Sequence, residues 1–398
     1  FNAFGERAGG HNNVILGRYA GYSNSTGLNN FAANNGSLMC NISGSNNFAG
    51  GYVTLTSNTT GYNNVAIGPA ALRNNTSGIN NIALGQCALA LNTTGQYNIA
   101  LGQCAMRCHD TIGNNNIALG YSALRENEGC YNVALGSVAS FCNTTGCYNT
   151  SLGYNAGKCN TTGCHNVSIG LCAGPLNQTS SDNISIGQHT NYCGLGAANI
   201  AIGRKTRFHD DLAGNSFNVA IGDCAMMGAT NMGTSEGNIA IGRGAGFAHT
   251  AGLANIFLGC YVGACNKGGN QNVLLSRKAG YRNETGNDNV MIGDCAGYGD
   301  SGSGGTNQND NVFIGKYAGY NNRGNHNIGI GIRAGEKIQT ATCNIFLGPQ
   351  AGRCASTGSN NFAAGYNVMN LANLTGSNNI AIGHYTGRRI ATGQGNVF

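Results

Sequence analysis

Cysteine is the most reactive side chain that recurs in this sequence, and it recurs at a fixed interval. The 398 residues include 17 cysteines. A density this high is typical of an oxidising compartment and predicts disulfides. A zinc site would instead need Cys-x-x-Cys spacing, which the sequence lacks. Three sets of cysteines are spaced by 17 residues: Cys130, Cys147 and Cys164; Cys142 and Cys159; Cys87 and Cys104.

Two CNTTGC segments allow more than one pairing scheme. Each segment could close its own turn, as Cys142–Cys147 and Cys159–Cys164, and we favour this scheme. Alternatively, equivalent cysteines of successive repeats pair, as Cys142–Cys159. Stacked repeats would place such α-carbons about 4.8 Å apart, inside the disulfide window of roughly 4.4–6.8 Å.

Outside the CNTTGC segments, the cysteines allow pairing between repeats or no pairing at all. For Cys87 and Cys104 we favour the pairing between repeats. Buried free thiols are the third possibility. The odd cysteine count leaves at least one thiol free or bonded to another chain.

Asn-x-Ser/Thr sequons are the second chemical feature, and the sequence contains 15 of them. Most fall in NTTG-like stretches, where we expect the side chain to project into water and accept an N-glycan. The same stretches are also good turns without any sugar. The candidate sites are Asn24, Asn41, Asn58, Asn75, Asn92, Asn143, Asn160, Asn177, Asn283 and Asn373.

Catalytic and metal-binding patterns are missing from the sequence. Acidic residues are sparse and form no paired constellation, and the histidines share no ligand spacing. The best local cluster is His209 with Asp210 and Asp211, which we interpret as loop polarity. The calcium-binding nonapeptide of some β-helices is absent. We therefore expect a protein that is not an enzyme and that holds no cofactor.

A 17-residue repeat positions all these residues. It begins with Asn, and numbering from that Asn gives 22 complete blocks, 14 of them 17 residues long. Column 2 is apolar in nearly every block, column 4 is Ile or Leu in 19 of 22, and column 5 is almost always Gly. Alternation followed by Gly predicts a short strand and a turn. A single block buries too little to stand alone, so the pattern predicts one parallel β-solenoid of about 22 rungs.

The domain prediction follows from the repeat. Residues 1–398 form one continuous solenoid, with a partial rung at 1–12, full rungs over 13–395 and a partial rung at 396–398. Insertions near 213–217, 229–237 and 299–310 lengthen individual rungs.

Columns 2 and 4 are expected to face the core. Column 4 is neither Ile nor Leu in three blocks, and in all three column 2 is Phe: Phe31, Phe48 and Phe362. This exchange of volume is typical of a packed interior, and each ring is expected to fill the space beside it. Column 1 is expected to form a buried ladder of stacked amides, which includes Asn64, Asn81, Asn98, Asn116, Asn132, Asn149, Asn166 and Asn183.

Column 3 is then expected to face outward. Large apolar residues there predict either a partner surface or a surface covered by loops. The candidates are Phe257, Leu274, Met291, Phe313 and Phe346, with Phe1 and Phe398 as residues for end-to-end stacking.

Charge and hydropathy exclude two classes of partner. The net charge of +6 is diffuse, and the basic clusters have no interleaved aromatic residues of the kind a nucleic-acid groove needs. No apolar run approaches the ~20 residues of a membrane span. We expect neither a nucleic-acid partner nor a membrane span.

Blocks such as NNVAIGPAAL (64–72 and its flanks), NIALGQCALALNTTGQY (81–97) and NIAIG (199–203, 238–242, 379–383) resemble the head repeats of trimeric autotransporter adhesins and the NTAIG…NTTG repeats of bacterial surface-fibre and phage tail-fibre-like proteins. The resemblance implies a left-handed parallel β-roll, extracellular display and frequent trimerisation. It also implies core positions at Val65, Ile67, Ile82, Leu84, Ile200, Ile202, Ile380 and Ile382.

These observations favour a structural role. We expect a subunit of an extracellular, N-glycosylated and disulfide-stabilised filament that self-associates end to end or laterally. The alternative is an adhesin or tail-fibre segment that binds a host glycan or matrix protein.

Overall fold

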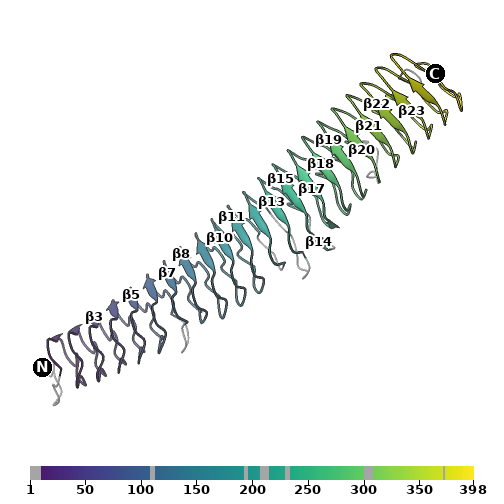
Figure 1. Cartoon of the computed structure of the whole chain (residues 1–398). Helices are drawn as coiled ribbons and strands as arrows, with labels where there is room; N and C mark the ends of the chain where they lie inside the picture. Colours follow the sequence, from purple (N-terminus) through teal and green to yellow (C-terminus); the bar gives the residue numbers. More distant parts are fainter. Residues whose placement is uncertain are drawn as a thin grey trace. The chain divides into compact units, whose positions relative to one another are not determined.

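The chain folds as an all-β parallel solenoid with a repeat of about 17 residues, as the sequence predicts (Figure 1). The computed structural model describes residues 10–107, 113–191, 196–206, 215–228, 234–299, 308–370 and 373–398, and no helix occurs among them. The chain divides into two compact units, Phe1–Cys193 and Gly194–Phe398.

Each repeat contributes one three-residue strand at columns 2 to 4. The first unit contains β1 (Val14–Leu16), β2 (Phe31–Ala33), β3 (Phe48–Gly50), β4 (Val65–Ile67), β5 (Ile82–Leu84), β6 (Ile99–Leu101), β7 (Ile117–Leu119), β8 (Val133–Leu135), β9 (Thr150–Leu152), β10 (Val167–Ile169) and β11 (Ile184–Ile186).

The second unit repeats this pattern. It contains β12 (Ile200–Ile202), β13 (Val219–Ile221), β15 (Ile239–Ile241), β17 (Ile256–Leu258), β18 (Val273–Leu275), β19 (Val290–Ile292), β20 (Val312–Ile314), β21 (Ile328–Ile330), β22 (Ile345–Leu347), β23 (Phe362–Ala364) and β24 (Ile380–Ile382). A second, two-stranded parallel sheet forms from β14 (Ser235–Glu236) and β16 (Gly252–Leu253).

Successive strands pair in parallel with equivalent residues opposite one another. Between β4 and β5, for example, Ala66 lies opposite Ala83. Column 5 then turns the chain with a positive φ, such as +126° at Gly85, where a Cβ would lie 2.7 Å from the Gly102 carbonyl oxygen of the next rung. The two column-5 exceptions, Asn34 (φ 92°) and Ser276 (φ 97°), adopt positive φ as well. Tight stacking therefore explains the glycine column.

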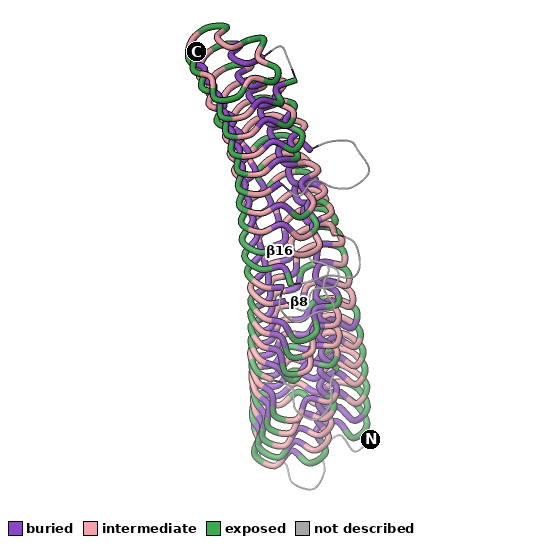
Figure 2. The backbone as a smooth tube through the Cα atoms, turned by 90° about the vertical axis from the view of Figure 1, so that its right-hand side faces the viewer, coloured by how far each residue is buried: buried purple, intermediate pink, exposed green. Residues whose placement is uncertain are grey.

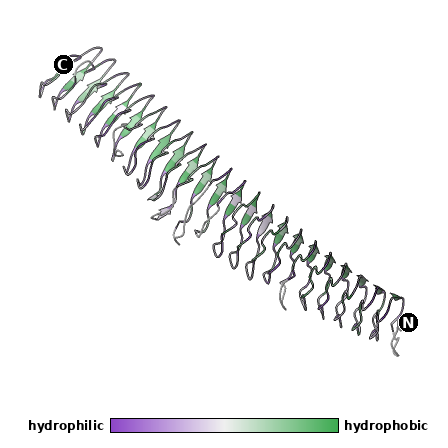
Figure 3. Cartoon of the chain, turned by 180° about the vertical axis from the view of Figure 1, so that it is seen from behind, coloured by the Kyte–Doolittle hydropathy of each residue, from purple (hydrophilic) through white to green (hydrophobic). Residues whose placement is uncertain are grey.

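The prediction of which strand columns face the core is wrong. Column 3 faces the core, and columns 2 and 4 face outward (Figure 2). Most strand residues are apolar in all three columns, and Figure 3 colours most of the strands as hydrophobic. All eight expected core positions are half-buried or exposed rather than buried: Val65, Ile67, Ile82, Leu84, Ile200, Ile202, Ile380 and Ile382.

The expected partner surface on column 3 is wrong for the same reason. All five of its strand residues are 0% exposed and belong to the core, so they are available neither to a partner nor to covering loops: Phe257, Leu274, Met291, Phe313 and Phe346.

The phenylalanines at column 2 also lie outside the core. Phe31 and Phe362 are half-buried and Phe48 is 37% exposed. The neighbour relation that their pattern predicted does exist at one of them, because a Cβ on Gly50 would lie 3.2 Å from the Phe48 ring. Phe31 and Phe48 stack with centroids 4.5 Å apart. The exchange of volume therefore occurs on the outward face of the sheet.

The core itself shows a different exchange of volume, between columns 3 and 9. Ala66 faces Leu72 in one rung, and both are fully buried. Where column 3 is large, column 9 becomes Gly: a Cβ at Gly319 would lie 2.5 Å from the Phe313 ring, and one at Gly297 would lie 2.2 Å from Met291 Sδ. One interior volume is thus filled from alternate sides in different rungs.

Candidate functional surfaces

The column-1 ladder is confirmed. Asn81 Nδ2 donates to Asn64 Oδ1 (3.2 Å) and to the Gly95 carbonyl (2.8 Å), and the Asn81 backbone N–H donates to the same Asn64 oxygen (3.0 Å). The eight predicted ladder residues are at most 5% exposed, and each backbone N–H from Asn64 onward donates to the side-chain oxygen one rung earlier. Each of these asparagines joins two rungs, and six of the eight side-chain amides also donate to a carbonyl in the turn of their own rung. The buried Nδ2 of Asn98 has no partner among the described residues.

A second asparagine ladder occupies column 12, which contains nine of the predicted glycosylation sites. Asn58 Nδ2 donates to Asn41 Oδ1 at 2.7 Å and to the Gly61 carbonyl at 2.9 Å. These side chains are at most 5% exposed, so the expectation that they project into water is wrong: Asn24, Asn41, Asn58, Asn75, Asn92, Asn143, Asn160, Asn177 and Asn283. A glycan on such a nitrogen would replace a buried donor and open the rung.

Three other sequons remain accessible. Asn373, the last of the predicted sites, is exposed, as is Asn35, and Asn74 is half-buried. Column 12 departs from Asn in this part of the chain, where Leu374 is fully buried and bridges to Ala355. Local sequence could not separate these sites, because the same NTTG-type residues make a turn and a sequon.

His249 replaces asparagine in the column-12 ladder. Its Nδ1 lies 3.1 Å from Asn266 Oδ1, and its ring packs edge-on against Phe257 at 5.7 Å. The residue is 5% exposed. Burial lowers the pKa of His249 to about 4, so the imidazole is neutral at pH 7.

The outward residues of the strands form an apolar stripe along each unit. We call the column 2 and column 4 residues of one unit its outer stripe. No strand from which the stripe is built contains a charged residue, and Thr150 is its one polar member among the described strands. Its aliphatic side chains are half-buried or exposed, for example Ile67 (41%), Ile82 (36%) and Ile382 (61%). An apolar surface this long is unusual for a free monomer.

Polar and charged groups border the outer stripe on the column-6 side. The Arg277 guanidinium pairs with Asp294 at 2.9 Å, and this hydrogen bond holds the pKa of the Asp294 carboxyl below its usual range. Arg204 and Asp223 repeat the arrangement at 2.9 Å, again lowering the pKa of the carboxyl. Such exposed pairs contribute little to stability, and together with the stripe they resemble the polar rim of an interface.

Stacked aromatic rings lie on the other side, at column 17. Tyr131, Tyr148 and His165 stack in one file with centroid spacings of 4.9 and 5.2 Å. His165 approaches Asp182 at 3.7 Å at the end of the file. Because the ring faces are used within the stack, the file presents ring edges rather than a stacking platform.

The described cysteines are free thiols in the structure, most of them half-buried. Cys87 and Cys104 occupy successive rungs, and the Cys104 N–H donates to the carbonyl of Gln86, the neighbour of Cys87. In the CNTTGC segments, the thiols of Cys147 and Cys164 accept from the backbone N–H of a cysteine on the preceding rung. The disulfide pairs remain predictions.

Several predicted residues lie outside the described part of the chain. They are Phe1, His209, Asp210, Asp211 and parts of the three insertions. Phe398 is described and is 49% exposed.

Within the described ranges, no group of three or more His, Cys, Asp or Glu side chains is arranged to hold a metal ion. The described residues form no helix, so none of them forms a helix long and apolar enough to cross a membrane.

Comparison with known proteins leaves the family of the chain undefined: no protein-family model matches it, and no characterised protein matches it significantly in sequence.

Proposed function

We propose that this chain is a structural subunit of an extracellular filament, and that it associates laterally with further copies of itself through the outer stripe. The observation that carries the proposal is that the stripe varies as a packed interior does, although it faces outward. In the rung where column 4 is Gly50, which has no side chain, column 2 is the large residue Phe48, and its ring lies beside the glycine. Water imposes no such matching of volumes, whereas a partner surface does.

The area of the stripe suits a stable interface. A fully exposed aliphatic side chain presents on the order of 100 Å² of apolar surface. About 20 such side chains in one unit, each roughly 30% exposed on average, would offer roughly 600 Å², somewhat less than the roughly 800 Å² that one partner contributes to a standard interface. Burying about 600 Å² contributes about 15 kcal/mol before the costs of association, which are about 4–15 kcal/mol.

A second copy of the chain is the occupant that fits best. Its rungs have the same spacing, so one row of side chains can enter the gaps of another over the whole length of a unit. The stripe carries no charge that would select a different protein, and its edges carry both signs, as Arg277 and Asp294 illustrate. A repetitive apolar surface with mixed polar edges is typical of self-association.

The test compares two substitutions in one rung. Ile82→Lys places a charge in the stripe, and Gln86→Lys places the same charge at the neighbouring column-6 position. Sedimentation velocity and negative-stain imaging of the purified chains should show assemblies for the parent and for Gln86→Lys, and mainly single chains for Ile82→Lys. Circular dichroism checks that both variants retain the fold. Equal assembly by both variants would contradict the role of the stripe.

Two further parts of the function are proposed with it. Extracellular location is supported by the cysteine content. N-glycans are proposed at Asn373, and the exposed sequon at Asn35 offers another site. Peptide mapping of chain secreted from a eukaryotic host should find glycan there and none on Asn75.

The alternative function is a segment that binds a host glycan or matrix protein. A cluster of exposed aromatic residues on an insertion would favour it. The described parts of the insertions contribute Phe217, which is 63% exposed, as an isolated ring. The outer stripe therefore favours self-association over this alternative.

A further inference from the structure

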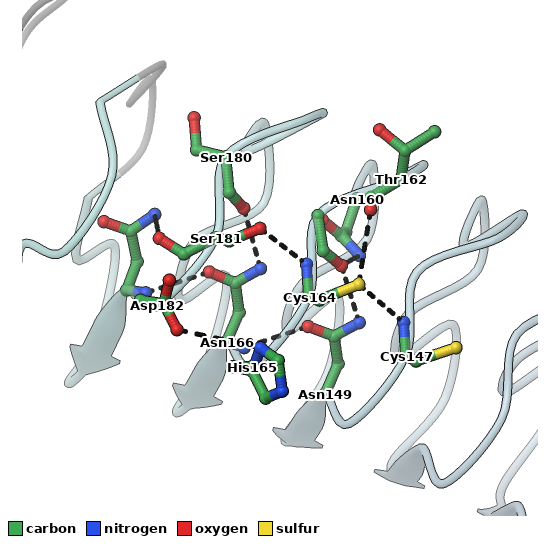
Figure 4. Close-up of polar contacts among 12 residues, drawn as sticks. Cys147, Asn149, Asn160, Thr162, Cys164, His165, Asn166, Ser180, Ser181 and Asp182 are labelled. Atoms are coloured by element: carbon green, nitrogen blue, oxygen red, sulfur yellow. Dashed lines mark hydrogen bonds and ion pairs between the residues drawn. The ribbon is translucent and has the colours of Figure 1, made fainter.

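Five cysteines gather on neighbouring rungs of the first unit and form two files. In the first file, the Cys130 N–H donates to Cys147 Sγ at 3.1 Å, and the Cys147 N–H donates to Cys164 Sγ at 3.2 Å. The file ends at Cys164, whose N–H donates to Ser181 Oγ at 3.0 Å. Figure 4 shows Cys147 and Cys164 on successive rungs, with Ser181 in the equivalent position of the next.

The second file consists of Cys142 and Cys159. Burial is the main cause that raises the pKa of Cys142, and the neighbouring Cys159 thiol acts in the same direction. Each backbone N–H donates to a carbonyl of the following rung, that of Lys158 or Pro175, at 2.9 Å. The side chains therefore lie one above the other.

Thiol proximity separates the two pairing schemes. The Cys147 thiol accepts from the Cys130 N–H, and the Cys147 N–H donates to the Cys164 thiol. Cys142 instead stacks beside Cys159, because its N–H donates to the carbonyl of Lys158, the neighbour of Cys159. The turn between Cys142 and Cys147 is closed by a different group, because Asn143 Nδ2 donates to the Gly146 carbonyl at 2.8 Å. The scheme favoured from the sequence, in which each CNTTGC closes on itself, would pair cysteines that belong to different files.

These rungs also have the weakest core. Between Ala139 and Ala201 the buried hydrophobic side chains of the described residues are limited to Ala156, Ala173 and Pro175. Column 3 is serine in three successive rungs here, and Ser140 Oγ bonds to Ser151 Oγ at 2.7 Å. Unlike the preceding rungs, which bury Leu or Met at column 9, these rungs gain little from apolar packing. A covalent link would act where packing contributes least.

We propose that these rungs are stapled by rung-to-rung disulfides, Cys142–Cys159 and Cys130–Cys147, and that Cys164 is left as a thiol. Each bond forms when two thiols lose two protons and two electrons. A small disulfide oxidant such as glutathione disulfide accepts them and is reduced to two thiols. The α-carbons of stacked rungs, about 4.8 Å apart, suit the bond without movement of the backbone. The inference rests on the oxidising compartment of the proposed function, but its test supplies the oxidant and is independent of filament formation.

The test uses the trypsin sites at Arg125 and Lys158. They place Cys130, Cys142 and Cys147 on peptide 126–158, and Cys159, Cys164, Cys172 and Cys193 on peptide 159–204. The purified full-length chain is oxidised with glutathione disulfide, alkylated with iodoacetamide, denatured, digested and analysed by mass spectrometry. We expect the two peptides to be joined until a reductant is added, with Cys164 alkylated. Pairing within each CNTTGC would release them as separate peptides and overturn the proposal.

Two substitutions complete the test. Cys142→Ser should release the two peptides while a Cys130–Cys147 bond persists inside peptide 126–158. Cys172→Ser, a change at another cysteine of the second peptide, should leave the link intact. A link that survives Cys142→Ser would join Cys130 or Cys147 to the second peptide and overturn the pairing of the first file. Full alkylation of all five cysteines in the oxidised parent would overturn both staples.

Discussion

The exchange of volume between columns 3 and 9 leads to a prediction about two buried residues. Phe313 is fully buried, and its ring fills the space beside Gly319. Phe313→Ala should empty that space, and Gly319→Leu should overfill it. Together the two substitutions recreate the pair that Ala66 and Leu72 form in another rung. The double variant should therefore be more stable than the single changes suggest.

Magnitudes follow from the local geometry. Removing a buried Phe side chain costs about 3–5 kcal/mol. Overpacking at Gly319, where a Cβ would already lie 2.5 Å from the ring, costs about 1–3 kcal/mol, and the left-handed φ of +58° adds about 1–2 kcal/mol. Leu72 shows that a rung accepts leucine at φ 49°. Some loss should persist, because the Phe313 ring also lies against Gly329, where a Cβ would be 2.9 Å away.

Guanidinium denaturation of the four chains measures the cycle, and hydrogen exchange of the Val312–Ile314 amides reports on the rung itself. We expect the double variant to recover about 1–3 kcal/mol relative to the sum of the single losses, a coupling typical of residues in direct contact. Phe217→Ala, at an exposed ring, is the matched control and should change little. Additive losses in the double variant would refute the assignment of columns 3 and 9 to one shared interior.

Three other predictions concern polar groups. The pKa of His249 is about 4 in the folded chain and 6.5 in the unfolded chain. The free energy of unfolding should therefore be highest above pH 6.5 and fall by about 3 kcal/mol as the pH drops to 4, because the unfolded chain binds the proton first. His249→Asn should remove this pH dependence, and an unchanged pH profile in that variant would contradict the argument. Asn81→Ala should cost about 2–4 kcal/mol by orphaning the buried Asn98 N–H and Gly95 carbonyl. Asn35→Ala, at an exposed amide whose backbone is outside the left-handed region, should cost under ~0.5 kcal/mol; denaturation midpoints compare them. Association through the outer stripe should strengthen on moderate warming and carry a negative heat-capacity change by calorimetry, and a positive one would count against apolar burial.

The sequence was sufficient to predict the rung register and the first asparagine ladder. Both follow from identical residues at a fixed spacing, since parallel in-register stacking is the arrangement that brings them together. Asn64 and Asn81 are bonded as expected. The inward-facing side of the strands was not predicted correctly, because alternation distinguishes two faces of a strand without showing which of them faces the core.

A stronger signal for the core was present in the sequence. Strands of parallel sheets are apolar on both faces, so column 3 could be small and still be the core, as Ala66 is. The decisive pattern is that Gly appears at column 9 when column 3 is Phe, Met or Leu, as at Phe346 and Gly352. A non-local exchange of this kind fixes the interior better than the alternation within one strand.

The buried second ladder escaped prediction for a chemical reason. Asn, Thr and Gly in succession satisfy the requirements of a turn, of a sequon and of a buried amide stack. Only the three-dimensional structure shows that both N–H groups of Asn58 are used internally. Burial of the acceptor nitrogen, rather than the sequon itself, decides where a glycan can be attached.

Variation in rung length supports the special role of the outer stripe. Successive column-1 asparagines are separated by as many as 22 residues, as between Asn289 and Asn311, or by as few as 16. Val290 nevertheless pairs with Val312 in register. All of the extra residues enter after column 9, and none enters the strand or its glycine turn. A solvent-exposed face would tolerate insertions as readily as the turns do. Because columns 2 to 5 keep a constant length through both units, two constraints act on them: the core beneath and, on our proposal, a second copy above.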